Sequence, residues 1–159
     1  MTDISVSVVV VSHARPDDLR LCLLGLDQLY YPNFEIVVVA DKKSAVVVQE
    51  FDGITLVPFE DNNISTARNL GASSACGQIV AYIDDDAVPE PTWLDHLVAV
   101  FGSPDVAAAG GYIIGRNGIS LQWSAQSVDE FGWSHDVESI GDAPRLLKAD
   151  DKGNAIRTP

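Results

Sequence analysis

The sequence has 159 residues, of which 47% are hydrophobic and 21% are charged, so it holds enough apolar material for one globular domain with a real core. Ten basic residues stand against 23 acidic ones, which gives a formal net charge of −13 at pH 7. A field of that sign repels phosphate polymers, so we expect no binding to nucleic acid. An anionic small ligand needs a local remedy, either a metal ion or a few placed arginines.

The sequence also gives no sign of membrane insertion or secretion. No apolar run reaches the roughly 20 residues that a membrane-spanning helix requires, so we expect no transmembrane segment in this chain. The first residues include an acid and lack the basic flank and long apolar stretch of a signal peptide. Cys22 and Cys76 lie far apart in predicted helices, so we interpret both as buried thiols of a reducing compartment and expect a cytoplasmic location.

The first part of the chain alternates predicted strands with predicted helices. An almost unbroken β-branched run from Val6 to Val11 predicts a strand that is covered on both faces. Pro16 then opens a helix that carries two acids in its first turn and continues to Leu29. The elements that follow are a strand at 35–39, a short helix at 44–51 and a strand at 54–58.

The next predicted helix has Asn62 or Asn63 as its N-cap and Gly77 as its stop. It has a narrow face of small residues, which predicts close approach to the sheet: Ala67, Leu70, Gly71 and Ser74. After it, we expect a strand at 79–83 that runs into three aspartates, a helix at 93–101 and a fifth strand at 106–114.

This alternation predicts right-handed βαβ units, and hence an α/β fold whose mostly parallel central sheet is flanked by helices. The last 45 residues differ, because they hold scattered aromatics, acids and glycines without clear periodicity. Residues 148–159 are polar and predicted to be loose. We therefore divide the chain into an α/β part, 1–114, and an irregular region, 115–159, of the same domain.

In open α/β sheets, ligands bind outside the carboxyl ends of the strands. Chemically active side chains follow three of the predicted strands. They are Ser12, His13 and Arg15 after the first strand, Asp41 after the second and Asp84–Asp86 after the fourth. We expect these groups to converge on one crevice although they are far apart in the sequence.

Three consecutive aspartates after a buried strand are costly unless a cation joins them, because neighbouring carboxylates resist desolvation together. If extended backbone persists through them, Asp84 and Asp86 share a face and Asp85 points away. Such a pair suits Mg²⁺ or Mn²⁺, which fills its coordination shell with water and substrate phosphate oxygens. The alternative is a solvated acidic turn that caps the helix starting near Pro91.

Three basic residues near the crevice each have a functional and a structural interpretation. Arg15 holds a phosphate or pairs with the acids of the helical turn that follows it. His13 stacks on a base or satisfies nearby backbone groups. Arg68 helps its helix N-terminus hold a phosphate, or it forms a salt bridge with Glu60 or Asp61.

Four segments, in this order and spacing, resemble the family 2 glycosyltransferases over about residues 4–114: VSVVVVSHARP from Val6, EIVVVAD from Glu35, ARNLG from Ala67 and IDDDAVP from Ile83. The resemblance implies the GT-A fold, the Rossmann-like fold of nucleotide-diphospho-sugar transferases. It also implies a nucleotide-diphosphate-sugar donor, Mn²⁺ or Mg²⁺ as cofactor, and a role in cell-envelope polysaccharide biosynthesis. Residues 1–114 would then be the nucleotide-sugar-binding part, and 115–159 the start of the acceptor side.

The resemblance implies nucleotide-sugar contacts at seven positions: Ser12, His13, Arg15, Asp41, Arg68, Asp84 and Asp85. The loop after the first strand would contact base and ribose, Asp41 would read the base edge, and Arg68 would lie beside the nucleotide. Asp84 and Asp85 would hold ribose and sugar. Asp86 is implied as the principal metal ligand, together with Asp84.

The implied reaction is metal-dependent, inverting transfer of a sugar to the hydroxyl of a carbohydrate or lipid-linked acceptor. Peripheral membrane association stays open. We assign no catalytic base, because Asp129-Glu130 comes earlier than the family's Glu-Asp pair and in a different context. We therefore expect a chain that is truncated on the acceptor side. The family's Asp-Asp-Gly-Ser is replaced by Ala40-Asp41-Lys42-Lys43, which leaves the base preference open.

Two other functions fit parts of the pattern. One is a haloacid-dehalogenase-type phosphatase with Asp84 as nucleophile and Asp86 as acid/base, although its motif normally follows an early strand rather than the fourth. The other is a non-catalytic nucleotide-sugar-binding fragment or module, which binds without turnover. A Rossmann oxidoreductase is disfavoured, because the first strand–helix turn has no GxGxxG.

Overall fold

The computed structural model describes residues 4–102, 106–111 and 113–115, and the backbone of four short strands further along the chain. The chain forms two compact units, Met1–Asp95 and His96–Pro159. The first unit contains the central sheet and its covering helices. The sequence-based division at residue 114 stays a prediction.

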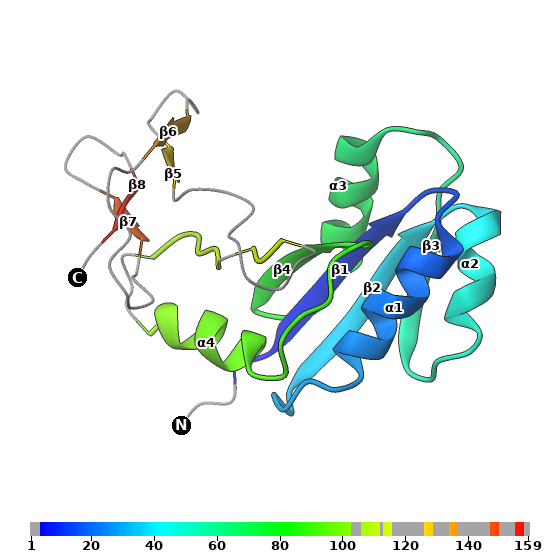
Figure 1. Ribbon diagram of the computed structural model, residues 1–159, viewed down its shortest axis with the longest axis horizontal. Helices are drawn as coiled ribbons and strands as arrows, with labels where there is room; N and C mark the ends of the chain where they lie inside the picture. Colours follow the sequence, from blue (N-terminus) through cyan, green and yellow to red (C-terminus); the bar gives the residue numbers. More distant parts are fainter. Residues whose placement is uncertain are drawn as a thin grey trace. The chain divides into compact units, whose positions relative to one another are not determined.

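Four parallel strands form the sheet of the first unit, in the order β3-β2-β1-β4 (Figure 1). Their bounds are β1 (Val6–Ser12), β2 (Phe34–Ala40), β3 (Ile54–Pro58) and β4 (Ile79–Asp84). The valines of β1 and β2 other than Val11 are buried, because these two strands lie in the middle of the sheet with helices on both faces. That position explains the unbroken β-branched runs, and the predicted parallel α/β sheet is confirmed.

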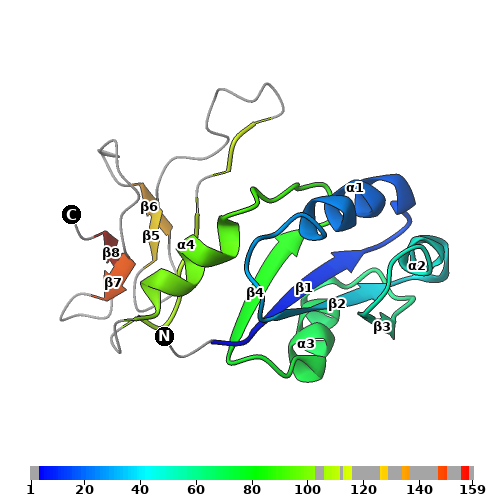
Figure 2. The ribbon, with the colours of Figure 1, turned by 90° about the horizontal axis from the view of Figure 1, so that it is seen from below.

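Helices cover both faces of this sheet: α1 (Pro16–Leu26) and α2 (Lys42–Val48) lie on one face and α3 (Ile64–Ser74) on the other (Figure 2). Asn63 is the N-cap of α3, since its side chain accepts a hydrogen bond from Thr66 N at 3.0 Å. A further helix, α4 (Trp93–Val100), ends close to the predicted position.

The strand order reverses next to β1. Each of the first two crossovers adds a strand on one side of β1, whereas α3 carries the chain to the other side, where β4 pairs with β1. Open α/β sheets bind ligands at such a switch point, outside the carboxyl ends of the strands. The register places Asp84 opposite Val11 and Ala40 opposite Ser12, so the residues that follow β1, β2 and β4 emerge at one level.

The α3 helix packs very closely on the sheet. A Cβ atom built on Gly71 would lie 2.4 Å from Val9 Cγ1 and 3.1 Å from Val39 Cγ2, so only a glycine fits without movement. Ala67, one turn earlier, is buried. The predicted face of small residues is therefore confirmed at these two positions, whereas Leu70 is 37% exposed.

Two expectations about the end of α3 are wrong. Gly77 is not the helix stop, because α3 ends at Ser74 with Ala75 as its C-cap. Gly77 instead lies against β1, where a Cβ would come within 2.6 Å of Ser7 N. Cys76 follows the helix and is exposed, whereas Cys22 is buried in α1 as expected, and burial raises the pKa of its thiol to about 12.

The expected strand at 106–114 is also wrong where the structure describes it. Residues 106–111 and 113–115 contain no strand, and only Ile114 has a single β-bridge. The alanines and glycines of 107–111 have low strand propensity, which outweighs their apolar character.

Residues 148–159 are not loose throughout, because β7 (Leu147–Ala149) pairs antiparallel with β8 (Ala155–Arg157). Strands of three residues are too short to give a readable alternation. A second short pair joins β5 (Gln126–Val128) and β6 (Ser134–Asp136).

Glu35 ties three segments together at the amino end of the sheet. Its Oε1 accepts hydrogen bonds from Ser7 Oγ and from Cys76 N, the latter at 2.6 Å, and Ser7 Oγ accepts one from Gly77 N at 2.7 Å. The Ser7 hydroxyl and then the Cys76 amide lower the pKa of Glu35. A carboxylate with a lowered pKa stabilises the fold above its ordinary pKa, and this stabilisation is lost as the pH falls through the folded-state pKa.

We expect Glu35→Gln to lower the free energy of unfolding at pH 7 by about 0.5–1.5 kcal/mol, because the charge-assisted hydrogen bonds weaken. Urea unfolding at pH 7 and again below the folded-state pKa checks this, and the difference between variant and wild type should shrink at the lower pH. Glu50→Gln is the control, since Glu50 also has a pKa lowered by a partner, Arg20, but lies on the surface. Equal stability of Glu35→Gln and wild type at pH 7 would contradict the prediction.

Candidate functional site

A cleft of about 460 Å³ opens at the carboxyl ends of the strands. Its walls come from the ends of β1 and β4, the β1–α1 loop, the β3–α3 loop and the start of α3. This volume lies in the usual range for small-ligand sites, about 300–1,000 Å³. The position is the switch point of the sheet, where ligand binding is expected.

The cleft brings together almost all of the residues that the sequence singled out. Those that line it are Ser12, His13, Arg15, Arg68, Asp84, Asp85 and Asp86. The predicted convergence of distant segments therefore occurs, whereas the individual roles of these residues toward a donor stay predictions. Asp41 alone is not among the lining residues.

Asp41 supports the cleft from behind. It is the N-cap of α2, and its Oδ1 accepts hydrogen bonds from Ser44 N at 3.0 Å and from Ala14 N at 3.1 Å. Burial alone would raise the pKa of Asp41, but the two backbone donors outweigh it and lower the pKa. Ala14 has a left-handed φ of 58°, so Asp41 stabilises a strained turn in the β1–α1 loop. Its predicted role at a base edge stays a prediction.

The three aspartates do not continue the strand. β4 ends at Asp84, and Ala87 N donates to Asp84 O at 3.1 Å, which closes a turn over Asp85 and Asp86. The expectation that Asp84 and Asp86 share a face required extended backbone, and this requirement is not met. The side chains differ in exposure: 67% for Asp84, 5% for Asp85 and 39% for Asp86.

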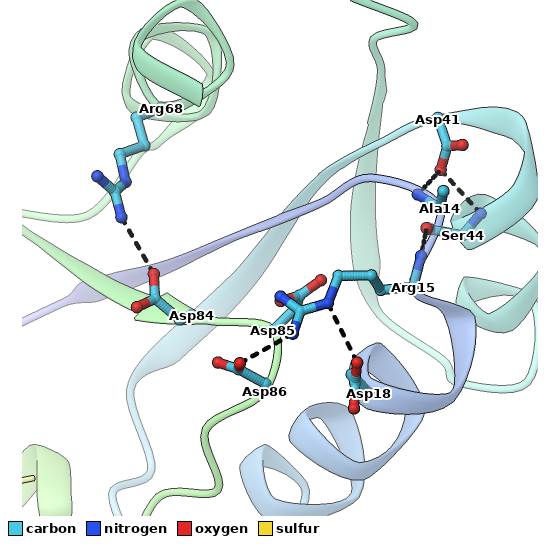
Figure 3. Close-up of polar contacts among 9 residues, drawn as sticks. All are labelled: Ala14, Arg15, Asp18, Asp41, Ser44, Arg68, Asp84, Asp85 and Asp86. Carbon is cyan, nitrogen blue, oxygen red and sulfur yellow. Dashed lines mark hydrogen bonds and ion pairs between the residues drawn. The ribbon is translucent and has the colours of Figure 1, made fainter. Parts of the chain in front are cut away.

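Two arginines pair with this acidic turn (Figure 3). Arg15 Nη1 lies 2.8 Å from Asp85 Oδ1, and Arg15 Nη2 lies 2.9 Å from Asp86 Oδ2. On the other side of the turn, Arg68 Nη2 lies 3.0 Å from Asp84 Oδ1. Arg15 thus pairs with two carboxylates of the acidic turn as well as with its expected partner Asp18, whose Oδ2 lies 3.1 Å from Arg15 Nε.

The structural interpretation of Arg68 as a partner of Glu60 or Asp61 is wrong, since its ion pair is with Asp84. Sequence reasoning missed the contacts of both arginines with the acidic turn. Arg15 lies about 70 residues before its partners, and no local pattern encodes such a pair.

Two buried groups lie under this network. Burial raises the pKa of Asp85, and the charge of the Arg15 guanidinium opposes that effect. Ser12 is only 2% exposed, yet its Oγ has no hydrogen-bond partner among the described residues. A buried hydroxyl without a partner costs about 1–3 kcal/mol, so this atom is a ready contact for a bound ligand.

Sequence reasoning missed the wall that the β3–α3 loop contributes. Phe59, Asp61, Asn62 and Ile64 line the cleft there. Asp61 and Asn62 had only structural interpretations, as a salt-bridge partner and a cap. Their position directly after the carboxyl end of β3 was the signal that could have identified them.

The donor set of the acidic turn fits a hard divalent cation. Asp84 and Asp86 present accessible carboxylate oxygens to the cleft, and Mg²⁺ or Mn²⁺ is commonly held by one or two carboxylates plus water and phosphate oxygens. No group of three or more His, Cys, Asp or Glu side chains in the described part of the chain is arranged to hold a metal. A cation held here by Asp84 and Asp86 would therefore take water or phosphate oxygens as its remaining ligands.

Comparison with known families decides between the glycosyltransferase and the phosphatase interpretations. The family described as glycosyl transferase family 2 matches residues 7–157. The chain belongs to this family. Membership excludes the phosphatase interpretation of Asp84 and Asp86, and the resemblance over residues 4–114 is confirmed.

Two curated relatives are about a third identical to this chain over the aligned segments. A glucosyl-dolichyl phosphate glucuronosyltransferase of Haloferax volcanii is 37% identical over 97 residues, which cover 56% of this chain and 31% of the relative. The O-antigen biosynthesis protein RfbC of Myxococcus xanthus is 32% identical over 114 residues, 66% of this chain and 9% of the relative. The chain thus spans well under half of the length of these relatives.

Solved structures confirm the GT-A type of fold. The mannosyltransferase PcManGT from Pyrobaculum calidifontis, in complex with GDP-Man and Mn²⁺, is 25% identical with a TM-score of 0.61, over 65% of this chain and 34% of that one. S. aureus TarS 1-349 in complex with UDP-GlcNAc is 20% identical with a TM-score of 0.58, over 62% and 31%. Among the described residues, no helix is both long and apolar enough to span a bilayer.

Proposed function

We propose that the cleft binds a nucleotide-diphosphate sugar and that this chain carries the donor-binding part of a metal-dependent, inverting glycosyltransferase. The observation that carries the proposal is the convergence of two arginines, one histidine and an acidic turn at the switch point of the sheet. The mannosyltransferase with GDP-Man and Mn²⁺ supports it, because that structure shares the fold.

The chain's own groups suit a diphosphate. The N-terminal turn of α3 borders the cleft, and the backbone N–H groups of a helix N-terminus attract phosphate. Arg68 lies on the second turn of this helix and Arg15 opposite it, so both guanidinium groups can reach phosphate oxygens. Asp84 and Asp86 would hold the cation, and the Ser12 hydroxyl would donate a hydrogen bond to the nucleotide sugar.

The proposed transfer is a single displacement. The acceptor hydroxyl oxygen attacks the anomeric carbon, the bond from that carbon to the diphosphate oxygen breaks, and a carboxylate base takes the hydroxyl proton. A bound Mn²⁺ or Mg²⁺ supplies Lewis-acid stabilisation of the departing diphosphate. Arg15 and Arg68 add positive charge at the same place. Asp129 and Glu130 lie outside the described residues, and the base is unassigned.

The acceptor class follows from the relatives' names alone. One acts on a glucosyl-dolichyl phosphate and another in O-antigen biosynthesis, so we propose a lipid-linked or carbohydrate acceptor and a polysaccharide product. Both classes present the hydroxyl nucleophile that the proposed displacement requires.

A thermal-shift panel tests the donor proposal. UDP-, GDP- and dTDP-sugars are added with and without Mn²⁺. We expect the sugars of one nucleotide to raise the melting temperature clearly, and only when Mn²⁺ is present. This outcome follows because the anionic cleft needs the cation before it accepts a diphosphate. Stabilisation by no donor under any condition would contradict the proposal. Metal-dependent donor binding with no sugar release or transfer would favour the non-catalytic binding module.

A further inference from the structure

Each carboxylate of the acidic turn, Asp84–Asp86, has an arginine partner from another segment of the chain. Arg68 on α3 pairs with Asp84, and Arg15, at the N-cap of α1, pairs with both Asp85 and Asp86. Figure 3 shows the two arginines on opposite sides of the turn, each directed toward its own carboxylates. The two candidate cation ligands, Asp84 and Asp86, are therefore engaged by different arginines.

This arrangement makes a divalent cation a competitor of the arginines. An oxygen of Asp86 that accepts from Arg15 Nη2 at 2.9 Å is not available to a cation in the same geometry. A cation that takes this oxygen must displace Arg15, and a cation that takes the other oxygen of Asp86 lies next to the guanidinium and is repelled by it, so Arg15 opposes binding in both cases. The same holds for Arg68 and Asp84.

The charge balance shows when this exchange becomes favourable. With Asp18 included, four carboxylates and two guanidinium groups leave two negative charges in excess. A divalent cation alone leaves released guanidinium groups without partners, and a diphosphate alone adds charge of the wrong sign. A divalent cation and the doubly negative diphosphate of a nucleotide sugar together leave the net charge unchanged. The released arginines also gain phosphate oxygens as partners. Each ligand should therefore favour the other, which is reciprocal coupling between two binding events.

The contacts of Arg15 suit a guanidinium that changes partners. Its Nε pairs with Asp18 at 3.1 Å, on the helix that begins next to it, whereas its two Nη atoms contact the turn. The Asp18 contact can persist while the Nη atoms leave. Ser12 Oγ is an independent indication that the cleft takes a polar ligand, since this buried hydroxyl has no hydrogen-bond partner among the described residues and Ser12 lines the same cleft.

We propose that Arg15 is an internal counter-cation: in the donor-free protein it occupies Asp85 and Asp86 in competition with the divalent cation, and it passes to the diphosphate when cation and donor bind together. Arg15 thereby acts as a positioning residue for the acidic turn. The inference rests on the proposed function for the identity of the diphosphate, but its first step, competition with the cation, is measurable without any donor.

Calorimetric titration of Mn²⁺ into the chain, without nucleotide, tests that step. Arg15→Gln should bind Mn²⁺ more tightly than wild type, by roughly two- to fivefold, the range of one partly exposed ion pair. Arg20→Gln is the matched control, because Arg20 also lies on α1 and pairs with Glu50 and Asp17, away from the acidic turn. Its Mn²⁺ affinity should equal that of wild type. Adding Asp86→Asn to Arg15→Gln should remove the gain.

A second titration adds a nucleoside diphosphate to wild type and Arg15→Gln. In wild type the diphosphate should raise Mn²⁺ affinity more than in Arg15→Gln, which lacks the group that passes to the phosphates. A purely structural role of Arg15 would weaken Mn²⁺ binding and lower the melting temperature instead. If Arg15→Gln does not fold, Arg15→Lys is the alternative variant. Lysine keeps the charge but cannot contact Asp85 and Asp86 through two separate nitrogens, so the Mn²⁺ affinity should still rise.

The inference is overturned by unchanged or weaker Mn²⁺ binding in a folded Arg15 variant, by an equal gain in Arg20→Gln, or by absence of Mn²⁺ binding in every variant. Failure of the proposed function is separate. If no nucleotide sugar binds but Arg15→Gln gains Mn²⁺ affinity, the donor proposal fails and the competition stands. If a donor binds with Mn²⁺ and Arg15→Gln shows no gain, the competition fails and the donor proposal stands.

Discussion

Asp86→Asn is expected to remove the Mn²⁺-dependent binding of the donor, with a loss of about two orders of magnitude or more in affinity, because a carboxylate ligand is worth several kcal/mol at such a site. The amide keeps the shape of the side chain but carries no charge. Asp86 lines the cleft and is 39% exposed, so the substitution removes little packing. Titration calorimetry with Mn²⁺ and the donor identified by the thermal-shift panel measures the loss.

Asp18→Asn is the matched control for this experiment. Asp18 contacts the same arginine at 3.1 Å and is 42% exposed, but it does not line the cleft. We expect Asp18→Asn to keep Mn²⁺-dependent donor binding within a few-fold of wild type. Equal effects of the two substitutions would mean that the carboxylates act only through Arg15, and the proposed cation site would be wrong.

Gly71→Ala is expected to lower the free energy of unfolding by about 1–3 kcal/mol, the usual cost of overpacking a close contact. The new Cβ would lie 2.4 Å from Val9 Cγ1 in the central strand, so α3 must move away from the sheet. Because α3 carries Arg68 into the cleft, donor affinity should also fall. Urea unfolding and the donor titration measure the two effects.

Gly110→Ala controls for the loss of glycine flexibility, since nothing lies within 4 Å of a Cβ at that position. We expect its free energy of unfolding to stay within about 0.5 kcal/mol of wild type, as for ordinary exposed substitutions. A Gly71→Ala variant with wild-type stability would show that α3 can accommodate a methyl group against Val9, which would contradict the close packing of α3 on the sheet.

The sequence predicts the sheet and the place of the cleft because both depend on local pattern. The runs of valine in β1 and β2 predict central strands, and Asn63 predicts the start of α3. The rule that ligands bind at the carboxyl ends of strands then places His13 and the acidic turn at one edge. These features need no knowledge of which side chains meet.

The contacts within the cleft could not be predicted in this way. Whether Asp86 shares a face with Asp84 depends on where β4 turns, and that turn follows Asp84 directly. The pairs of Arg15 and Arg68 with the turn depend on tertiary structure, as does the role of Asp41 behind the β1–α1 loop. Gly77 reads as a helix stop by composition, although its contact with Ser7 is what requires a glycine.

The proposed donor site depends on a divalent cation that joins a diphosphate to Asp84 and Asp86 in this strongly anionic chain. Anomalous diffraction from crystals soaked with Mn²⁺ and a nucleoside diphosphate tests it most directly. We predict a manganese peak that coordinates an oxygen of Asp86 or Asp84 and an oxygen of the diphosphate, with Arg15 displaced from Asp86. A diphosphate bound in the cleft with no metal at these carboxylates, or manganese only at a distant site, would contradict the account.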